Sequence, residues 1–350
     1  MAHDVWSPLV IAEKAGERSD PEERGVQKWL DHLVADDREP HGYDLALARW
    51  QRSLRGRGDR MLTGQAAGRL LVGHGNPSPT EVGLSLHRTW GVPFIPGSAL
   101  KGLLAHWAEI TLGPHEDMNE DERAHRAPWA GPERDERGNA VRRPGEAYER
   151  VFGAPPLRGH ERSARRGKLV VHDALWLPGV DKNSRTKAAL APDVLTVHQR
   201  RYYQGDEPWP SDGDDPIPVS FITVRPGTKF LFAVSSDDAE IADWAADALR
   251  CVLQDWGVGG KTAAGYGRFE RVVLCDPPLL AELGETLEAS KRGGESEQDR
   301  LDLLSAEWVE RLRTLPLSGH AALAKLLRKY VKSKKKRPQL DALLARIIAP

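Results

Sequence analysis

The chain has 350 residues, of which 40% are hydrophobic and 29% are charged, as in ordinary globular proteins. Its formal net charge of −1 at pH 7 excludes a protein that binds polyanions over its whole surface, so any nucleic-acid surface must be local. We find no apolar run of the roughly 18 residues that a membrane span needs, no signal-peptide core and no cysteine framework. We therefore expect a cytoplasmic protein without a membrane partner, and the lack of CxxC and HExxH motifs predicts no metal and no cofactor.

Residues 1–65 are predicted to form a helical N-terminal extension. Apolar residues recur at helical spacing in two segments of it, 22–35 and 43–56. Several arginines follow the second segment, between residues 52 and 60. Such a run is more often a solvated face than a binding patch.

Strands and helices alternate after this extension. Short apolar or alternating segments predict strands, and Pro226-Gly227 predicts a hairpin turn between two of them. Asp237 and Glu240 have the spacing of a capping box for a helix that ends before residue 257. The predicted strands are residues 69–73, 83–90, 168–176, 219–224, 229–234 and 268–274.

Another helix is predicted to begin within residues 96–102, with Ser98 as its N-cap. Lys101 lies in its first turn, where a cation is unfavourable by roughly 0.3–1 kcal/mol next to the positive end of the helix dipole. That placement is explained if a phosphate binds the free N–H groups and the ammonium together. A lysine that is merely exposed is the alternative.

The loop 257–268, which we call the glycine loop, is the most distinctive segment. It contains five glycines and two cations, and it is longer than the about 2–6 residues of an ordinary connector. Such a loop can bind an anion through its N–H groups, although its glycines could also serve the turn alone. Its spacing fits neither a Walker A loop nor a Rossmann fingerprint. The residues expected to contact phosphate are Gly259, Gly260, Lys261, Thr262, Gly265, Tyr266 and Arg268.

Two long polar insertions interrupt the strand and helix pattern. Residues 113–166 are highly charged and poor in aliphatic side chains, so we expect little core there. Residues 178–218 place His198, Arg200 and Arg201 close to two tyrosines. Arginine beside tyrosine suits an RNA backbone with stacked bases, and it also suits a protein interface.

Residues 277–350 are predicted to form a basic helical C-terminal extension. A flexible glycine linker is expected at 293–297, followed by helices at 300–313, 320–332 and 338–348. The basic run 332–337 could contact RNA, but terminal basic runs are commonly only solubilising.

Residues 66–276, without their insertions, give the order strand, helix, strand, hairpin strands, helix, glycine loop, strand. This order predicts an α+β protein with a ferredoxin-like (RRM-like) βαββαβ core, long insertions at 113–166 and 178–218, and helical N- and C-terminal extensions. The aromatic signature of RNA-recognition motifs is absent.

Three segments in the expected order, 96–102, 167–174 and 259–269, resemble motifs of the RAMP superfamily of CRISPR proteins, in its Cas7-like branch. Residues 193–198 and 218–224 are similar to the pattern of Cmr subunits of type III-B effector complexes. The resemblance extends over about residues 69–275 and leaves both ends of the chain outside it.

This resemblance implies a non-catalytic subunit that binds the 3′ region of the guide RNA (crRNA) in a type III-B CRISPR-Cas (Cmr) RNA-targeting effector complex, in antiviral defence. Its implied partners are guide and target RNA and neighbouring Cmr, Cas7-like and small subunits. If the family's RNA-contacting positions are carried over to this sequence, Lys101 and the loop from Lys261 to Arg268 would hold guide-RNA phosphates. Residues 178–218 take the place of the family's thumb, which wedges into the guide–target duplex, with Asp193, His198, Arg200 and Arg201 on or near it.

An enzyme is the alternative. RNA-cutting subunits of these complexes carry an aspartate in the loop after the first strand, and residues 74–81 contain none, so we expect no cleavage. A metal-independent endoribonuclease of the superfamily, which processes guide RNA, needs a general base and a general acid at the scissile phosphate. A scaffold without RNA contact would leave Lys101 and Lys261 unexplained. The candidate acids and bases are His74, His87, His172, His198 and Tyr266.

Overall fold

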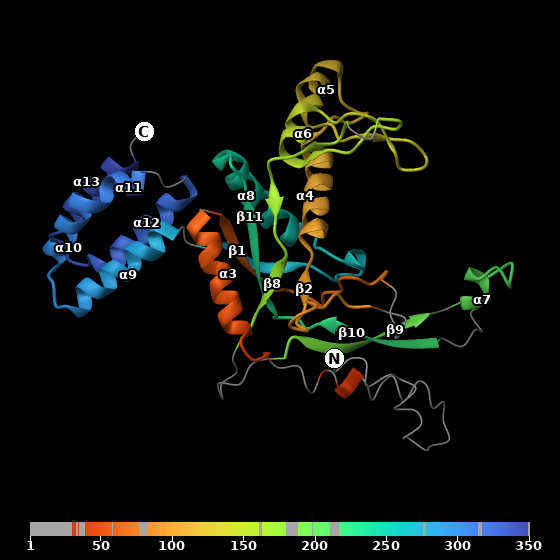
Figure 1. Cartoon of the computed structure of the whole chain (residues 1–350), viewed down its shortest axis with the longest axis horizontal. Coiled ribbons are helices and arrows are strands. Elements are labelled where there is room, and N and C mark those ends of the chain that lie inside the picture. Colours follow the sequence, from red (N-terminus) through yellow and green to blue (C-terminus); the bar gives the residue numbers. More distant parts are fainter. Residues whose placement is uncertain are drawn as a thin grey trace.

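The computed structural model of the chain describes residues 30–32, 34, 39–57, 59–76, 83–160, 163–179, 188–197, 199–210, 217–275, 278–313 and 317–348. It is a mixed helix and sheet protein with a central antiparallel sheet, a separate β-hairpin and a C-terminal helical bundle (Figure 1). Among the described residues, no helix is long and apolar enough to cross a membrane. The predicted helix 22–35 lies largely outside the described residues.

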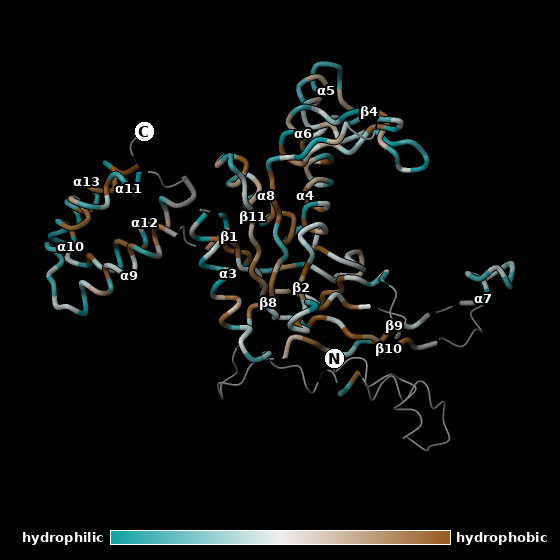
Figure 2. The backbone as a smooth tube through the Cα atoms, viewed as in Figure 1, coloured by the Kyte–Doolittle hydropathy of each residue, from teal (hydrophilic) through white to brown (hydrophobic). Residues whose placement is uncertain are grey.

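The central sheet has the strand order β12-β1-β11-β8-β2, and β7 also pairs with β11. Every pairing in it is antiparallel. Hydrophobic residues run along its central strands (Figure 2). Its strands are β1 (Arg60–Ala66), β2 (Phe94–Ile95), β7 (Val170–Val171), β8 (Ala174–Leu177), β11 (Lys229–Ser235) and β12 (Phe269–Leu274).

Two helices cover this sheet and pack on each other, α4 (Gly97–Leu112) and α8 (Ala239–Asp255). Helix α8 forms because apolar residues recur every three or four positions, and Ile241, Leu249 and Leu253 are buried as a result. Its N-cap is Asp238, whose carboxylate accepts the N–H of Glu240. The predicted capping box of Asp237 and Glu240 is therefore wrong by one residue. Helix α3 (Tyr43–Arg57) adds Tyr43 to the same core, where the Tyr43 hydroxyl donates to the carbonyl of Trp176 at 2.8 Å.

The first strand is β1, nine residues earlier than predicted. Residues 69–72 are buried or nearly so, but they make only an isolated bridge, Leu70 to Val224. The predicted strand 83–90 is mostly irregular, with one bridge from Leu86 to Pro93. The predicted strand 168–176 is broken into β7 and β8. These errors share a cause, because short apolar or alternating segments predict strands but also occur in irregular structure.

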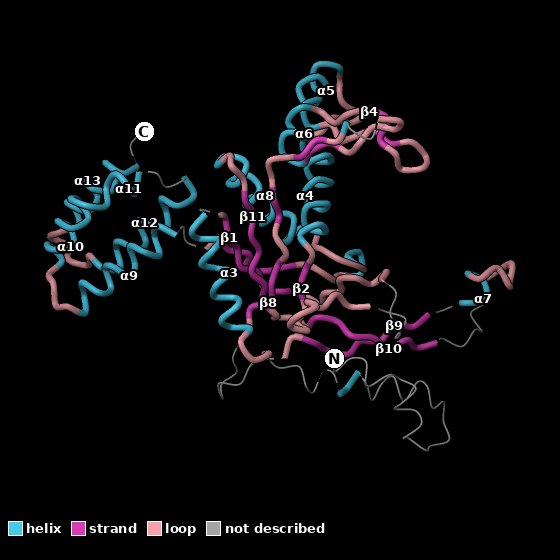
Figure 3. Tube along the Cα trace, in the orientation of Figure 1, coloured by secondary structure: helices cyan, strands magenta, loops and turns pink. Residues whose placement is uncertain are grey.

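Strand β10 (Ile217–Val224) corrects another prediction. The sequence suggests that it pairs with β11 across Pro226-Gly227, yet it pairs along its whole length with β9 (Leu190–Val197). The two strands form a hairpin, called here the β9–β10 hairpin, that extends away from the central sheet (Figures 1 and 3). A lone two-stranded hairpin is marginal in water. Its base is anchored by Leu190 and Ile222, which form a small buried cluster with Leu30.

The insertion 113–166 has more structure than predicted. Tyr148 and Val151 are buried, and the ring of Phe152 contacts Trp244 of α8. The insertion therefore shares the main core where it meets α8 instead of remaining loosely structured. It contains α5 (Glu120–Arg126), a 3₁₀ turn (Ala127–Trp129), α6 (Glu146–Phe152) and the strand pairs β3 (Glu133–Arg134) with β4 (Ala140–Arg142) and β5 (Gly153–Ala154) with β6 (Arg165–Arg166).

The C-terminal region is a helical bundle with its own buried cluster, which includes Leu283, Leu304 and Leu327. The predicted helices after residue 297 are confirmed. The expected flexible linker is instead a short turn, in which the Ser290 hydroxyl donates to Glu295 and Ser296 caps the next helix. The helices are α9 (Pro278–Arg292), α10 (Glu297–Leu303) continued by a π-turn (Leu304–Trp308), α11 (Val309–Arg313), α12 (Leu317–Tyr330) and α13 (Arg337–Ile348).

Candidate nucleic-acid interface

The glycine loop connects α8 to β12 and lies directly against residues 67–74. The N–H of Gly260 donates to the carbonyl of Leu71 at 2.7 Å, and the N–H of Gly267 donates to that of Arg69 at 2.8 Å. The carbonyl of Arg268 accepts the N–H of Ala67 at 2.9 Å. The two backbones are thus held together along the length of the loop.

This apposition explains why glycine occupies the loop. Gly267 has a φ of 75°, and a Cβ there would overlap the carbonyl oxygen of Val258. Gly259 has a φ of 95°, and a Cβ there would overlap the carbonyl oxygen of Leu71. Part of the glycine content is therefore structural, in agreement with the alternative that these glycines serve the turn.

The cationic side chains of the glycine loop are not engaged with other parts of the described chain through ion pairs. Lys261 has a left-handed backbone, with φ 60°, and precedes a 3₁₀ turn from Thr262 to Ala264 that ends at Gly265. Arg268 is exposed, as is Arg271 in β12. None of these three cations forms an ion pair with another residue of the described ranges. They are available for an anion that comes from outside the chain.

The predicted phosphate site at the start of α4 is different. Ser98 is not the N-cap, since α4 begins at Gly97 after Pro96, and no side chain of these residues caps it. The N–H of Gly97 instead donates to the carboxylate of Asp173 at 2.7 Å. The helix start is therefore already occupied by an anionic group of the chain.

Lys101 also has an internal partner. Its ammonium donates to the carbonyl of Leu169 at 2.9 Å, and burial, together with nearby Arg166, lowers the pKa of Lys101. A half-buried cation bonded to the carbonyl that precedes β7 stabilises the packing of α4 next to that strand. This geometry disfavours Lys101 as a phosphate contact and leaves Lys261 and Arg268 as the stronger candidates.

Tyr266 ties the glycine loop to the β9–β10 hairpin. Its hydroxyl donates to Asp193 at 2.6 Å, and Arg69 contacts the same carboxylate oxygen at 3.3 Å. Arg69 also donates to the carbonyl of Pro192 and to the hydroxyl of Thr223. Burial and the Asp193 carboxylate raise the pKa of Tyr266, so the phenol stays protonated as a donor. The network fixes the direction in which the hairpin leaves the core.

This network predicts a measurable energetic coupling. Tyr266→Phe removes a hydrogen bond to a charged group, and Asp193→Ala removes its acceptor. A double-mutant cycle should give a coupling energy of about 0.5–2 kcal/mol in urea unfolding, because the two side chains share one contact. Tyr203→Phe, at an exposed tyrosine outside the network, is the control and should show no coupling with Asp193→Ala. Additive effects at 266 and 193 would show that the bond does not hold the loop to the hairpin.

The far end of the hairpin, residues 199–210, is called here the hairpin tip. It includes α7 (Arg200–Tyr203), with Tyr203 77% exposed and Trp209 78% exposed. Arg201 pairs with Glu207 at 3.0 Å. His198 lies outside the described residues, and only the backbone of Arg200 is described. Sequence reasoning missed Trp209, although a tryptophan in a highly polar insertion is itself a signal of an exposed contact.

Four of the five candidate acids and bases, all but His198, lie within the described residues. His172 bonds to the Ser235 hydroxyl at 2.6 Å and lies against Trp50, and burial lowers the pKa of His172. The ring of His87 accepts the N–H of Thr89 at 3.3 Å. His74 has a buried Nδ1 without a partner among the described residues. No hydrogen bond joins any two of His74, His87, His172 and Tyr266 in that part of the chain.

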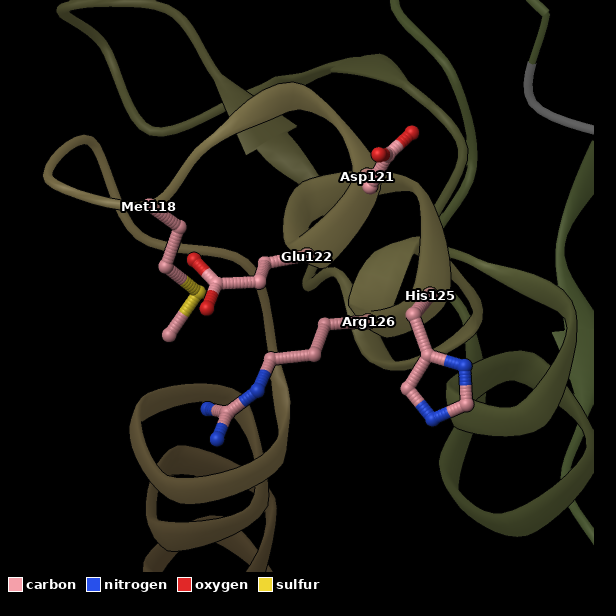
Figure 4. Close-up of a pocket in the computed structure, with 5 residues that line it drawn as sticks. All are labelled: Met118, Asp121, Glu122, His125 and Arg126. Atoms are coloured by element: carbon pink, nitrogen blue, oxygen red, sulfur yellow. The ribbon is translucent and has the colours of Figure 1, made fainter.

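A pocket of about 400 Å³ lies in the insertion (Figure 4). The Glu122 side chain that lines it accepts the N–H of Asn119, and Arg126 donates to the carbonyl of Thr111. Both groups are thus engaged in holding α5 in place. The lining residues are Met118, Asp121, Glu122, His125 and Arg126.

The sequence profile of the RAMP superfamily matches residues 65–270, which include most of the central sheet, both covering helices and the glycine loop. The chain therefore belongs to the RAMP superfamily.

Within it, the chain is similar to the CRISPR system Cmr subunit Cmr6 of Pyrococcus furiosus, with 33% identity over 226 residues. That match covers 59% of this chain and 66% of the relative, slightly under two thirds of its length. Among solved structures, the chain resembles the type III-B Cmr-beta complex bound to cognate target RNA, at 17% identity and a TM-score of 0.47, over 76% of this chain and 81% of that chain. It also resembles the crystal structure of Cmr6 from Pyrococcus furiosus, at 28% identity and a TM-score of 0.33, over 60% and 96% of the two chains.

Proposed function

We propose that this chain is a non-catalytic RNA-binding subunit of a type III-B CRISPR effector complex, which contacts the guide RNA and the neighbouring subunits. The chief support is the pair of cations on the glycine loop, Lys261 and Arg268, which have no ion-pair partner within the described residues. Cations of this kind fit phosphates of a strand that passes along the loop, because phosphate contacts position a nucleic acid without reading its sequence.

The family supports this proposal. Cmr6, to which the chain is similar, is a subunit of a Cmr system, and the Cmr-beta complex was solved with target RNA. We further propose that the core is ferredoxin-like. Its four main strands have the order β12-β1-β11-β8, in which the last strand lies beside the first and the third lies between the first and the second.

The absence of catalysis is part of the proposal. General acid–base cleavage of RNA needs two groups within hydrogen-bond reach of one phosphate. The described histidines are dispersed over different elements, and Tyr266 is engaged with Asp193. A binding role needs only the exposed cations described above, whereas a nuclease would also need a general acid and a general base close to one phosphate.

The test is RNA binding by charge-removed variants of the full chain. Lys261→Ala and Arg268→Ala should each weaken binding of a labelled CRISPR-repeat RNA about fivefold to tenfold, as expected for one charge-assisted contact. The loss should not depend on sequence, and each variant should reduce the salt slope by about 0.7. Filter binding or fluorescence anisotropy at several salt concentrations measures both quantities.

Arg250→Ala is the matched control, since Arg250 is an exposed arginine on α8 that pairs with Asp247 at 3.3 Å. It removes the same charge and should leave RNA binding unchanged. Equal binding by all three variants would contradict the RNA contact and favour a protein scaffold. Cleavage of the labelled RNA without metal, lost in His74→Ala, would contradict the non-catalytic role.

A further inference from the structure

The C-terminal bundle, which lies outside the segment that matches the family, has an uneven charge distribution. Residues 278–313 contain nine acidic and five basic residues, a net charge of −4. Residues 317–348 contain nine basic residues and one acidic residue, a net charge of +8. A surface that served only solubility would mix the two signs, so this separation indicates a dedicated positive surface.

The positive charge is gathered on α12 and on the turn that joins it to α13. Arg328 and Lys329 lie three and four positions after Lys325 and therefore share one exposed face of α12 with it, while Leu323 and Leu327 bury the other face. Exposed cations then continue through the turn: Lys332, Lys334, Lys335 and Arg337. We call these seven residues the basic face.

The turn is held rigidly from within the bundle. The carboxylate of Glu297 accepts the N–H groups of Lys332 and Ser333 at 3.0 and 3.1 Å, and Lys336 donates to Gln298. These contacts fix the backbone and leave neighbouring lysine side chains directed to solvent. Among the described residues, neither Lys334 nor Lys335 has an ion-pair or side-chain hydrogen-bond partner. A preordered cluster loses less conformational entropy when it binds than a mobile tail does.

We propose that the basic face binds the phosphate backbone of a nucleic acid, as a second contact separate from the glycine loop. Five of its seven residues are lysines, and lysine is depleted in protein–protein interfaces, where aromatic residues and arginine dominate. Lysine side chains are flexible and each carries one positive charge. A row of them suits the phosphate backbone of a nucleic acid that is bound without sequence preference. This contact does not depend on membership of an effector complex.

The test compares two full-chain variants with the same change of charge. Lys334→Glu with Lys335→Glu should weaken binding of a short single-stranded RNA about tenfold and reduce the salt slope by about 1.4, as for two lost phosphate contacts. Lys291→Glu with Arg292→Glu alters two exposed cations at the end of α9 and should change binding less than about twofold. The neutral pair Lys334→Gln with Lys335→Gln should lie between wild type and the glutamate pair, and unchanged thermal unfolding confirms an intact fold.

DNA of the same sequence and polyglutamate serve as further ligands. Loss of RNA and DNA binding together supports a backbone contact, and loss for RNA alone supports the same contact with RNA as its ligand. An equal loss for polyglutamate, or unchanged RNA binding with loss of a co-purified acidic protein, overturns the proposal. Lys261→Ala is measured in parallel: if it weakens RNA binding while the 334/335 pair does not, the second contact fails and the function proposed for the glycine loop stands.

Discussion

Gly267→Ala should destabilise the protein by about 2–5 kcal/mol. Alanine at a φ of 75° costs about 1–2 kcal/mol, because its Cβ crowds its own carbonyl in the left-handed region. A further 1–3 kcal/mol, roughly, comes from overlap of that Cβ with the Val258 carbonyl, since the loop is held to residues 67–74 and cannot relax freely. Urea unfolding of both proteins, compared at an unchanged m-value, measures the difference.

Gly265→Ala is the matched control for this prediction. Gly265 has a φ of 89°, and a Cβ there would meet nothing within 4 Å. It carries the backbone cost of about 1–2 kcal/mol without the overlap. If both variants lose the same stability, the close approach at Val258 contributes nothing. If Gly267→Ala lowers the free energy of unfolding by more than Gly265→Ala does, the close approach at Val258 requires glycine. The glycines then have a packing role, and the proposed RNA contact depends on Lys261 and Arg268.

Local sequence signals predicted the helices outside the insertion 113–166 better than those within it, α5 and α6. Helix α8 and the C-terminal helices follow from apolar residues at helical spacing, a property that a short window of sequence contains. The family resemblance is likewise carried by short motifs, and the superfamily match over residues 65–270 confirms it. The domain limits proposed from the sequence remain a prediction.

Strand partners could not be predicted in the same way. Strand β10 lies only four residues before β11, and proximity favours a hairpin between them. It pairs instead with β9, and the side chains of Arg225 and Thr223 also bond to carbonyls of β9, at Leu190 and Ala191. These contacts join residues more than thirty positions apart, and no local pattern contains them.

The candidate site shows the same limit. Lys101 looked free in the sequence because the partner of its ammonium, the carbonyl of Leu169, lies 68 residues away. Asp173, which occupies the start of α4, lies 76 residues beyond Gly97. The glycine loop could be recognised as one segment because its glycines and cations are close in sequence, and its contact with phosphate stays a prediction. The contacts of this loop with residues 67–74 could nevertheless not be predicted, because they depend on the three-dimensional fold.

The hairpin tip should provide the largest binding effect. Tyr203 and Trp209 are large aromatic side chains with more than three quarters of their surface exposed. Base stacking on an aromatic side chain contributes about 1–3 kcal/mol per base. Tyr203→Ala with Trp209→Ala should therefore weaken RNA binding by about 2–6 kcal/mol if both rings stack, with little change in the salt slope because no charge is lost.

The salt dependence of RNA binding distinguishes the contact at the hairpin tip from those of Lys261 and the basic face, because only the latter two involve charged side chains. Val194→Ala, which shortens another exposed apolar side chain on the β9–β10 hairpin, is the control and should bind RNA as wild type does. Stacking is also sequence-tolerant, so the loss should be similar for purine and pyrimidine strands. Unchanged RNA binding combined with failure to assemble with other Cmr subunits would assign the tip to a protein neighbour, since exposed tyrosine and tryptophan are also the side chains that anchor protein interfaces.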